Sequence, residues 1–358
     1  ISRALHVEYL MRDKVEFTDY FKDFILYAAK AKKVQNECNL GGAPYIGSCG
    51  DDLIENVTIY DTVERKHAGF QNMLQDLWFA DSAPKHYKWT KEHQERNVSF
   101  RHLQDTWSRR EWLFVFLTHR ITGSGASFEV DHGYRNTILP ELAKLKSVEE
   151  MVEWIRLYEG VMYTSIGNQI PAFPKPRGDY KTGGKVYFGE YALQLVDDVW
   201  NFVDEINRDR KALIREIVDF MCKWNRDRGM KAFHFQYTAT VADLADYYTD
   251  LVDEASHMYY GKNAQEAMDL FATKKSRINK AQFYDIVMEE AKINTGGYPK
   301  DLEDVMCDYI RFVENYIPDN REKTYAGLDR TKIWNTSIIK NHPKGRQRWM
   351  LGTTQWKW

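Results

Sequence analysis

The residues best suited to chemistry lie close together between positions 129 and 137. This stretch holds two carboxylates, an imidazole, a guanidinium and an amide, on Glu129, Asp131, His132, Arg135 and Asn136. A carboxylate or imidazole can take a proton from an attacking amine, and a guanidinium can grip a phosphate or diphosphate through two hydrogen bonds. The alternative to a reactive site is a solvated surface loop with an incidental histidine.

A run of small residues, G-S-G-A-S, precedes this stretch at positions 123–127. Small side chains let the backbone approach a ligand closely and direct N–H groups at an anion. The lysine followed by Ser or Thr that a P-loop requires is missing, so kinase or ATPase activity has no support. Upstream, polar residues that include Asn97 and Arg101 precede an apolar helical run ending at Arg120. We predict function where the helix, the small-residue turn and the charged loop join.

A second candidate is the segment 167–185, whose many Pro and Gly residues predict a long irregular loop. Its side chains offer cations for a nucleic-acid backbone and rings for stacking, on Lys175, Arg177, Lys181, Lys185, Phe173 and Tyr180. The alternative is a mobile excursion of the surface without a function.

A third candidate is the segment 321–358, which contains nine basic and two acidic residues and so carries a net charge of +7. Four tryptophans are interleaved with the cations, a composition typical of a segment that contacts phosphates and stacks on bases. Arg346 and Arg348 are the candidate DNA contacts. Because the whole chain has a formal net charge of −2, nucleic-acid affinity must come from such local basic surface. The alternative is a tail whose tryptophans pack back onto the body.

The elements that must position these residues read as helices. Apolar residues at three- and four-residue spacing predict helices over 18–33 and around 193–203, 213–224 and 241–251. Ser147 with Glu150 forms a capping box, Gly229 and Gly261 suit helix ends, and Pro299 suits a first turn. No sustained period-two pattern is present. The predicted fold class is mainly α, with long functional loops and a basic C-terminal arm.

The chain shows no internal repeat and no low-complexity linker, so one domain over 1–358 is predicted. A softer division near residue 210 separates a motif-rich catalytic part (1–210) from a helical part (211–320) and the basic aromatic arm (321–358). Four scattered cysteines without a C-x-x-C pair argue against structural zinc and suit a reducing cytoplasm. No apolar run approaches the roughly 20 residues that cross a bilayer, and we expect no membrane partner.

Three sequence segments form a recognisable set: R-I-T-G-S-G-A-S-F at 120–128, D-H-G-Y-R-N-T at 131–137 and G-E-Y-A-L-Q-L at 189–195. Together they resemble the amino acid:DNA transferase family of tailed bacteriophages. The stretch from Asn97 to Arg101, with Asp105, is similar to a pattern in the helical domain of phage 5-hydroxymethyluracil DNA kinases and in the α-glutamyl/putrescinyl thymine pyrophosphorylases. The likeness spans roughly residues 90 to 205.

The resemblance implies a helical, DNA-glycosylase-like fold and a step in thymine hypermodification. An amino-acid amine displaces diphosphate from 5-diphosphomethyl-deoxyuridine in double-stranded phage DNA, with the base flipped out of the helix. The implied roles are diphosphate or backbone binding by Arg101, Arg120, Ser124, Ser127 and Arg135, base reading by Asn97 and Asn136, proton transfer by Asp131 or His132, and amine binding by Glu190.

The implied partners are the modified duplex and a free amino acid, with glycine preferred over serine, glutamate or a polyamine. The sequence requires no cofactor, although Mg²⁺ could accompany the diphosphate. The implied location is the cytoplasm of the phage host. Two alternatives stay open: a DNA glycosylase-like base-processing enzyme, and a non-catalytic phage DNA-binding protein. The helix-hairpin-helix of many glycosylases is not visible in the sequence.

Overall fold

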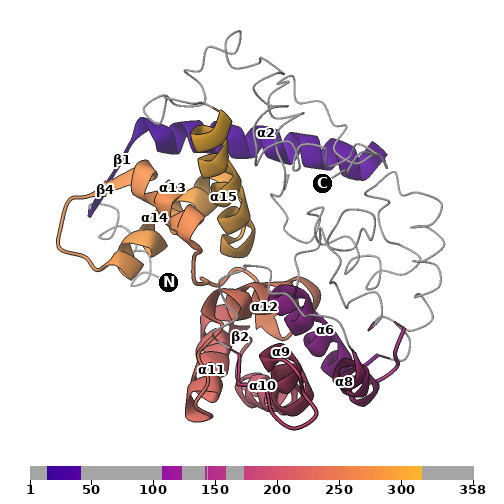
Figure 1. The fold of residues 1–358 in the computed structure, drawn as a ribbon. Coiled ribbons are helices and arrows are strands. Elements are labelled where there is room, and N and C mark those ends of the chain that lie inside the picture. Colours follow the sequence, from indigo (N-terminus) through magenta and orange to yellow (C-terminus); the bar gives the residue numbers. More distant parts are fainter. Residues whose placement is uncertain (1–13, 42–106, 123–141, 143, 159–172, 317–358) are drawn as a thin grey trace. The chain divides into compact units, whose positions relative to one another are not determined.

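The computed structural model describes residues 14–41, 107–122, 142, 144–158 and 173–316, which are mostly helical (Figure 1). This confirms the mainly α class. The described residues form two compact units. We call residues 14–41 and 260–316 the terminal unit, and residues 107–122, 142, 144–158 and 173–259 the central unit.

The terminal unit combines the start of the described chain with its end. It contains β1 (Val15–Phe17), α2 (Asp19–Gly41), α13 (Lys262–Phe271), β4 (Ala272–Lys274), α14 (Lys280–Thr295) and α15 (Pro299–Tyr316). β1 and β4 pair antiparallel, with Val15 opposite Lys274. The short pair joins segments more than 250 residues apart in the sequence, and Thr18 reinforces it by donating from its hydroxyl to the Leu270 carbonyl at 2.6 Å.

Aromatic rings fill the core of the terminal unit. Phe24 stacks on Phe271 with centroids 4.7 Å apart, and both rings contact Tyr309 of α15. The Tyr309 hydroxyl donates to Asp23 Oδ2 at 2.6 Å, so its polar end is satisfied although the ring is buried. These contacts join α2, α13 and α15.

The central unit contains α6 (Arg109–Thr122), α8 (Val148–Leu157), α9 (Gly183–Val186), the π-helix η7 (Tyr187–Tyr191), α10 (Ala192–Ile206), β2 (Ala212–Leu213), α11 (Ile214–Asp227), α12 (His234–Tyr247) and β3 (Val252–Asp253). β2 and β3 pair in parallel, with Ala212 opposite Val252. Residue 210, where the sequence suggested a soft division, lies inside this unit between α10 and β2. The single-domain prediction stays a prediction.

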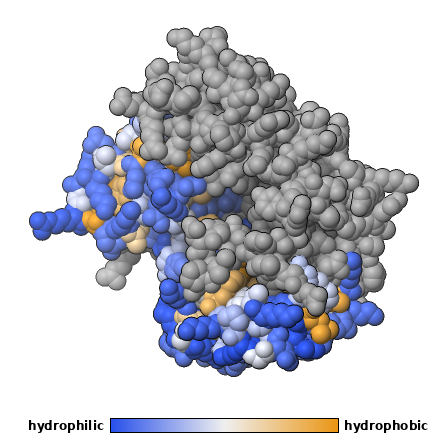
Figure 2. Space-filling model, viewed as in Figure 1, coloured by the Kyte–Doolittle hydropathy of each residue, from blue (hydrophilic) through white to orange (hydrophobic). Residues whose placement is uncertain are grey.

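Helices α6 and α12 form the centre of this unit. Every residue from Glu111 to Ile121 is buried, as is every residue from Gln236 to Tyr247. A helix buried on all sides lacks the polar face of a surface helix. Its hydroxyl groups must therefore bond locally, and Thr238 and Thr240 of α12 donate to the carbonyls of His234 and Gln236, each at 2.8 Å. Hydrophilic side chains cover most of the described surface seen in Figure 2, with smaller hydrophobic patches between them.

Several helix ends were predicted correctly from the local sequence pattern. Ser147 caps α8 by accepting from Glu150 N at 3.2 Å, and Pro299 opens α15, as predicted. The helix predicted over 18–33 extends to Gly41. Gly261 differs from its prediction because it caps the start of α13 instead of ending a helix. In the part of the chain that the structure describes, no helix combines the length and apolar character needed to cross a membrane.

Candidate functional site

The last turn of α6 is anchored by a buried ion pair. Arg120 donates from Nε to Asp243 Oδ2 and from Nη2 to Asp243 Oδ1, both at 2.5 Å. The two side chains are 10% and 0% exposed. Arg120 was predicted to grip a phosphate, but two of its guanidinium nitrogens are committed to α12. The predicted phosphate contact stays a prediction, and the observed role of Arg120 is to hold the last described turn of α6 against α12.

The packing of α6 on α12 has a defined register. The Phe116 ring stacks on the Tyr247 ring with centroids 5.3 Å apart, and Arg120 lies four residues later in α6, opposite Asp243, four residues earlier in α12. The two helices therefore run antiparallel. Residues four apart share one face of a helix, so both contacts belong to one interface.

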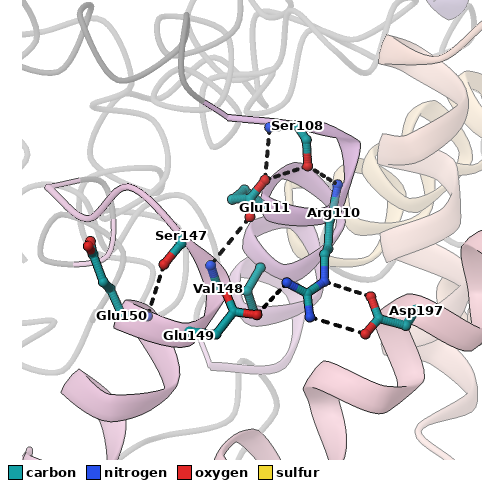
Figure 3. Close-up of polar contacts among 8 residues, drawn as sticks. All are labelled: Ser108, Arg110, Glu111, Ser147, Val148, Glu149, Glu150 and Asp197. Atoms are coloured by element: carbon teal, nitrogen blue, oxygen red, sulfur yellow. Dashed lines mark hydrogen bonds and ion pairs between the residues drawn. The ribbon is translucent and has the colours of Figure 1, made fainter.

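The first turn of α6 is held by a polar network that Figure 3 draws. Arg110 donates to Asp197 of α10 at 2.6 Å and to Glu149 of α8 at 2.5 Å. Glu111 accepts from the backbone N–H of Ser108 at 2.8 Å, which caps α6, and from Val148 N at 3.4 Å. The hydrogen bond from Arg110 lowers the pKa of Glu149. Both ends of α6 are thus fixed by charged side chains.

Arg177 and Glu190 form the polar cluster nearest to the predicted second loop. Arg177 donates from Nε to Glu190 Oε2 at 2.9 Å, pairs with the same oxygen through Nη2, and donates to the Tyr191 hydroxyl at 2.6 Å. Its guanidinium carbon lies 5.4 Å from the Tyr191 ring centroid. The side chains of Arg177 and Glu190 are 52% and 32% exposed. The proposed amine-binding carboxylate and a proposed DNA contact therefore hold each other at the surface.

The described part of the second loop packs against the helix that follows it. A Cβ added at Gly183 would lie 2.2 Å from the Pro174 carbonyl oxygen, and one added at Gly189 would lie 2.4 Å from the Tyr180 phenol oxygen. Gly178 adopts φ +56°, a left-handed conformation that suits glycine, in the tight turn closed by Tyr180 N donating to Arg177 O at 3.0 Å. Glycines thus allow this loop to lie close to α9 and η7.

The four cations of the second loop have different environments. Lys175 and Lys181 are exposed, as a DNA contact requires. Lys185 lies in α9 and is 3% exposed, with its ammonium 5.8 Å from the Tyr158 ring centroid. The irregular loop predicted through residue 185 therefore gives way to helix at Gly183, and Lys185 is buried in that helix.

Buried polar groups that the sequence did not single out lie in the central unit. The Tyr187 and Tyr237 hydroxyls are 2.7 Å apart and both rings are fully buried. Burial raises the pKa of Tyr187 well above its ordinary value. Asp243 and Gln236 are also buried. One sequence feature could have indicated these buried polar groups: the segment 234–247 carries Gln, Thr and Asp, yet apolar residues occur on every side of the helix it forms.

Most of the predicted reactive residues lie outside the described residues: Asn97, Arg101, Ser124, Ser127, Asp131, His132, Arg135, Asn136, Arg346 and Arg348. Within the described ranges, no three His, Cys, Asp or Glu side chains are grouped so that they could hold a metal ion. The Mg²⁺ that could accompany a diphosphate stays a prediction.

No family model matches the chain, and the comparisons with curated proteins and with solved structures give no match.

Proposed function

We propose that this protein is a phage DNA-hypermodifying transferase, which joins an amino acid to the methylene carbon of 5-diphosphomethyl-deoxyuridine in DNA. The motif at 120–128 begins at Arg120, and the anchoring of Arg120 by Asp243 is the observation that carries the proposal. Reactive loops need a rigid support, because small displacements of a reacting group greatly reduce rate. A buried bidentate pair at the first residue of the motif provides such a support.

A second observation supports the proposal. The motif at 189–195 runs from η7 into α10, which belongs to the same unit as α6. The indole N–H of Trp200 in α10 donates to the Arg109 carbonyl of α6 at 2.9 Å, and Arg110 pairs with Asp197. The described start of the first motif, residues 120–122, and the second motif therefore lie on helices of one unit that pack together.

The proposed step is a nucleophilic displacement. The amine nitrogen forms a bond to the methylene carbon while the bond from that carbon to the diphosphate oxygen breaks, and the diphosphate leaves with the electron pair. The amine gives up a proton to the base, Asp131 or His132. Cationic groups and backbone N–H groups stabilise the charge that develops on the leaving group. Glu190 accepts a hydrogen bond from the N–H of the incoming neutral amine once Arg177 has released its carboxylate.

The test is incubation of the full chain with duplex DNA containing 5-diphosphomethyl-deoxyuridine and a mixture of amino acids, followed by digestion and mass spectrometry of the nucleosides. We expect a nucleoside heavier by one amino acid and release of diphosphate. Unchanged nucleosides with every amine, in protein that binds the DNA, would overturn the proposal. Release of a free base would instead identify a glycosylase-like activity.

Matched variants make the assay specific. Asp131→Asn and His132→Gln test the two candidate bases, and we expect one of them to lower the product rate at least about 100-fold while DNA affinity is kept. Lys231→Gln is the control, because Lys231 is an exposed residue of the same unit. If both base variants behave like the control, the assigned bases are wrong even when product forms.

A further inference from the structure

Gln236 is a buried amide that nothing in the described residues satisfies. Its side chain is 1% exposed, and neither Oε1 nor Nε2 has a hydrogen-bond partner there. A primary amide has donor and acceptor capacity, and leaving it unused out of water is unfavourable. Buried polar groups of folded proteins are nearly always paired, so each exception needs an explanation. Binding of a ligand to the unpaired amide is one such explanation.

Gln236 shares a helix face with the anchoring pair. Asp243 is seven residues later in α12, and residues seven apart lie on the same side of a helix. Thr240 lies between them on that face and donates to the Gln236 carbonyl at 2.8 Å. The face that carries Gln236 is therefore the one that α12 presents to α6.

Helix α6 ends before it reaches the level of Gln236. The antiparallel register places Arg120 opposite Asp243, and α6 continues only to Thr122, about 3 Å further along its axis. Gln236 lies about 10 Å beyond Asp243 in the same direction. The amide thus sits past the C-terminal end of α6, at a level of α12 that α6 does not cover.

We propose that Gln236 is a specificity-determining residue that reads the edge of a flipped-out pyrimidine. A uracil-type edge presents N3–H as a donor beside the O4 acceptor, and a glutamine amide complements it by accepting at Oε1 and donating from Nε2. The site would thus satisfy both amide atoms with one ligand. The choice of a uracil-type base rests on the proposed function, whereas the need for a paired donor and acceptor rests on Gln236 alone.

The experiment measures binding of single-stranded oligonucleotides that carry one base in an otherwise abasic strand. One strand carries thymine and the other N3-methylthymine, which lacks the N3–H donor. We expect the wild-type protein to bind the thymine strand about tenfold more tightly, because a buried acceptor left without its donor loses roughly one hydrogen bond. We expect Gln236→Met, of similar shape without polar atoms, to bind the two strands equally.

Thermal unfolding separates this role from a structural one. Gln236→Met removes an unsatisfied amide, so its midpoint should be equal to or above that of the wild type. Gln265→Met is the matched control, because the Gln265 amide donates to the Tyr260 carbonyl at 2.7 Å. We expect the control to unfold at a lower temperature and to retain the preference for thymine.

Equal binding of the two strands by the wild-type protein, or a preference that survives Gln236→Met, would overturn the inference. If Gln236→Met fails to fold, Gln236→Leu replaces it in the same comparison, because a preference of the wild type alone does not assign the contact to Gln236. The transferase assay is independent of it: discrimination without any transfer product would keep Gln236 as a base reader and reject the proposed reaction. Product formation without discrimination between the two strands would support the proposed reaction and reject Gln236 as a base reader.

Discussion

Two arginine–carboxylate pairs of the central unit have similar chemistry and opposite surroundings. Arg120 and Asp243 meet between the packed helices α6 and α12, where their side chains are 10% and 0% exposed. Arg177 and Glu190 meet at the surface, with side chains 52% and 32% exposed. In each pair the guanidinium uses Nε and Nη2, and the first pair engages both carboxylate oxygens.

The difference in burial separates a pair that stays closed from a pair that can open and exchange its partners. A buried pair that loses one partner leaves a charge without water, so its geometry persists whatever binds nearby. An exposed pair contributes little to stability, because water solvates either partner when the pair opens. Under the proposed function, Arg120–Asp243 is therefore suited to hold a motif in place, and Arg177–Glu190 to release its members to a phosphate and an amine.

The strongest way to break this comparison is Asp243→Ala. Removing the carboxylate takes away both hydrogen bonds between the buried Arg120 guanidinium and Asp243, and we expect a loss of about 3–5 kcal/mol in the free energy of unfolding. Urea denaturation followed by circular dichroism measures it. The double variant Arg120→Met, Asp243→Leu should recover most of the loss, because it removes the charge as well. A loss below about 1 kcal/mol for Asp243→Ala would mean that water reaches the pair.

The next largest effect should come from Gly183→Ala. The new methyl group would meet the Pro174 backbone oxygen at 2.2 Å, so the chain carrying Arg177 must shift. We expect a loss of about 1–3 kcal/mol by urea denaturation, typical of overpacking. Gly178→Asn is the control, because space around Gly178 is open and asparagine tolerates φ +56°. Equal effects of the two variants would contradict the tight contact at Gly183.

A smaller effect concerns pH and the network at the start of α6. The hydrogen bond from Arg110 lowers the folded-state pKa of Glu149, so its stabilisation is complete above the unfolded pKa, about 4.3, and is lost as pH falls through the lowered value. Because Glu149 is 58% exposed, we expect only about 0.2–1 kcal/mol. Comparing urea midpoints of wild type and Arg110→Met at about pH 6 and about pH 3 should show the difference shrink at the lower pH. A difference in urea midpoint that grows at the lower pH would contradict a lowered pKa of Glu149.

The smallest effect on stability should be that of Arg177→Gln. The pair is exposed, so we expect the urea midpoint to stay unchanged. Under the proposed function the same variant loses one phosphate contact, and the slope of log affinity against log salt should fall by about one. Lys231→Gln serves again as the control. A clear loss of stability with an unchanged slope would show that Arg177 acts like Arg120.

The fold class and several helix ends followed from the sequence because they depend on local pattern. Ser147 caps α8 and Pro299 opens α15 through contacts within a few residues, and the spacing that predicts such ends is local. The partner of Arg120 was not predictable in this way. Asp243 lies 123 residues away, and nothing near Arg120 in the sequence indicates which carboxylate it meets.

The candidate site shows the same limit. Glu190 was identified from a motif, but its pairing with Arg177 depends on a turn around Gly178 and on close packing at Gly183. Lys185 looked like a loop cation, because its neighbours Gly183 and Gly184 do not favour a helix. Tertiary packing overrides that weak propensity, so the lysine is buried.

The π-helical turn η7 also sets an angular relationship. Helices α9, η7 and α10 run without a break from Gly183 to Ile206, and Ala192 N donates to the Tyr187 carbonyl five residues earlier. Each residue of an α-helix advances by about 100°, so removing one residue from the π-turn would rotate α9 by that amount about the axis of α10. Lys185 would leave the interior, and Gly183 would no longer face the Pro174 carbonyl oxygen. The number of residues in η7, more than their types, therefore sets the rotation of α9 about the axis of α10.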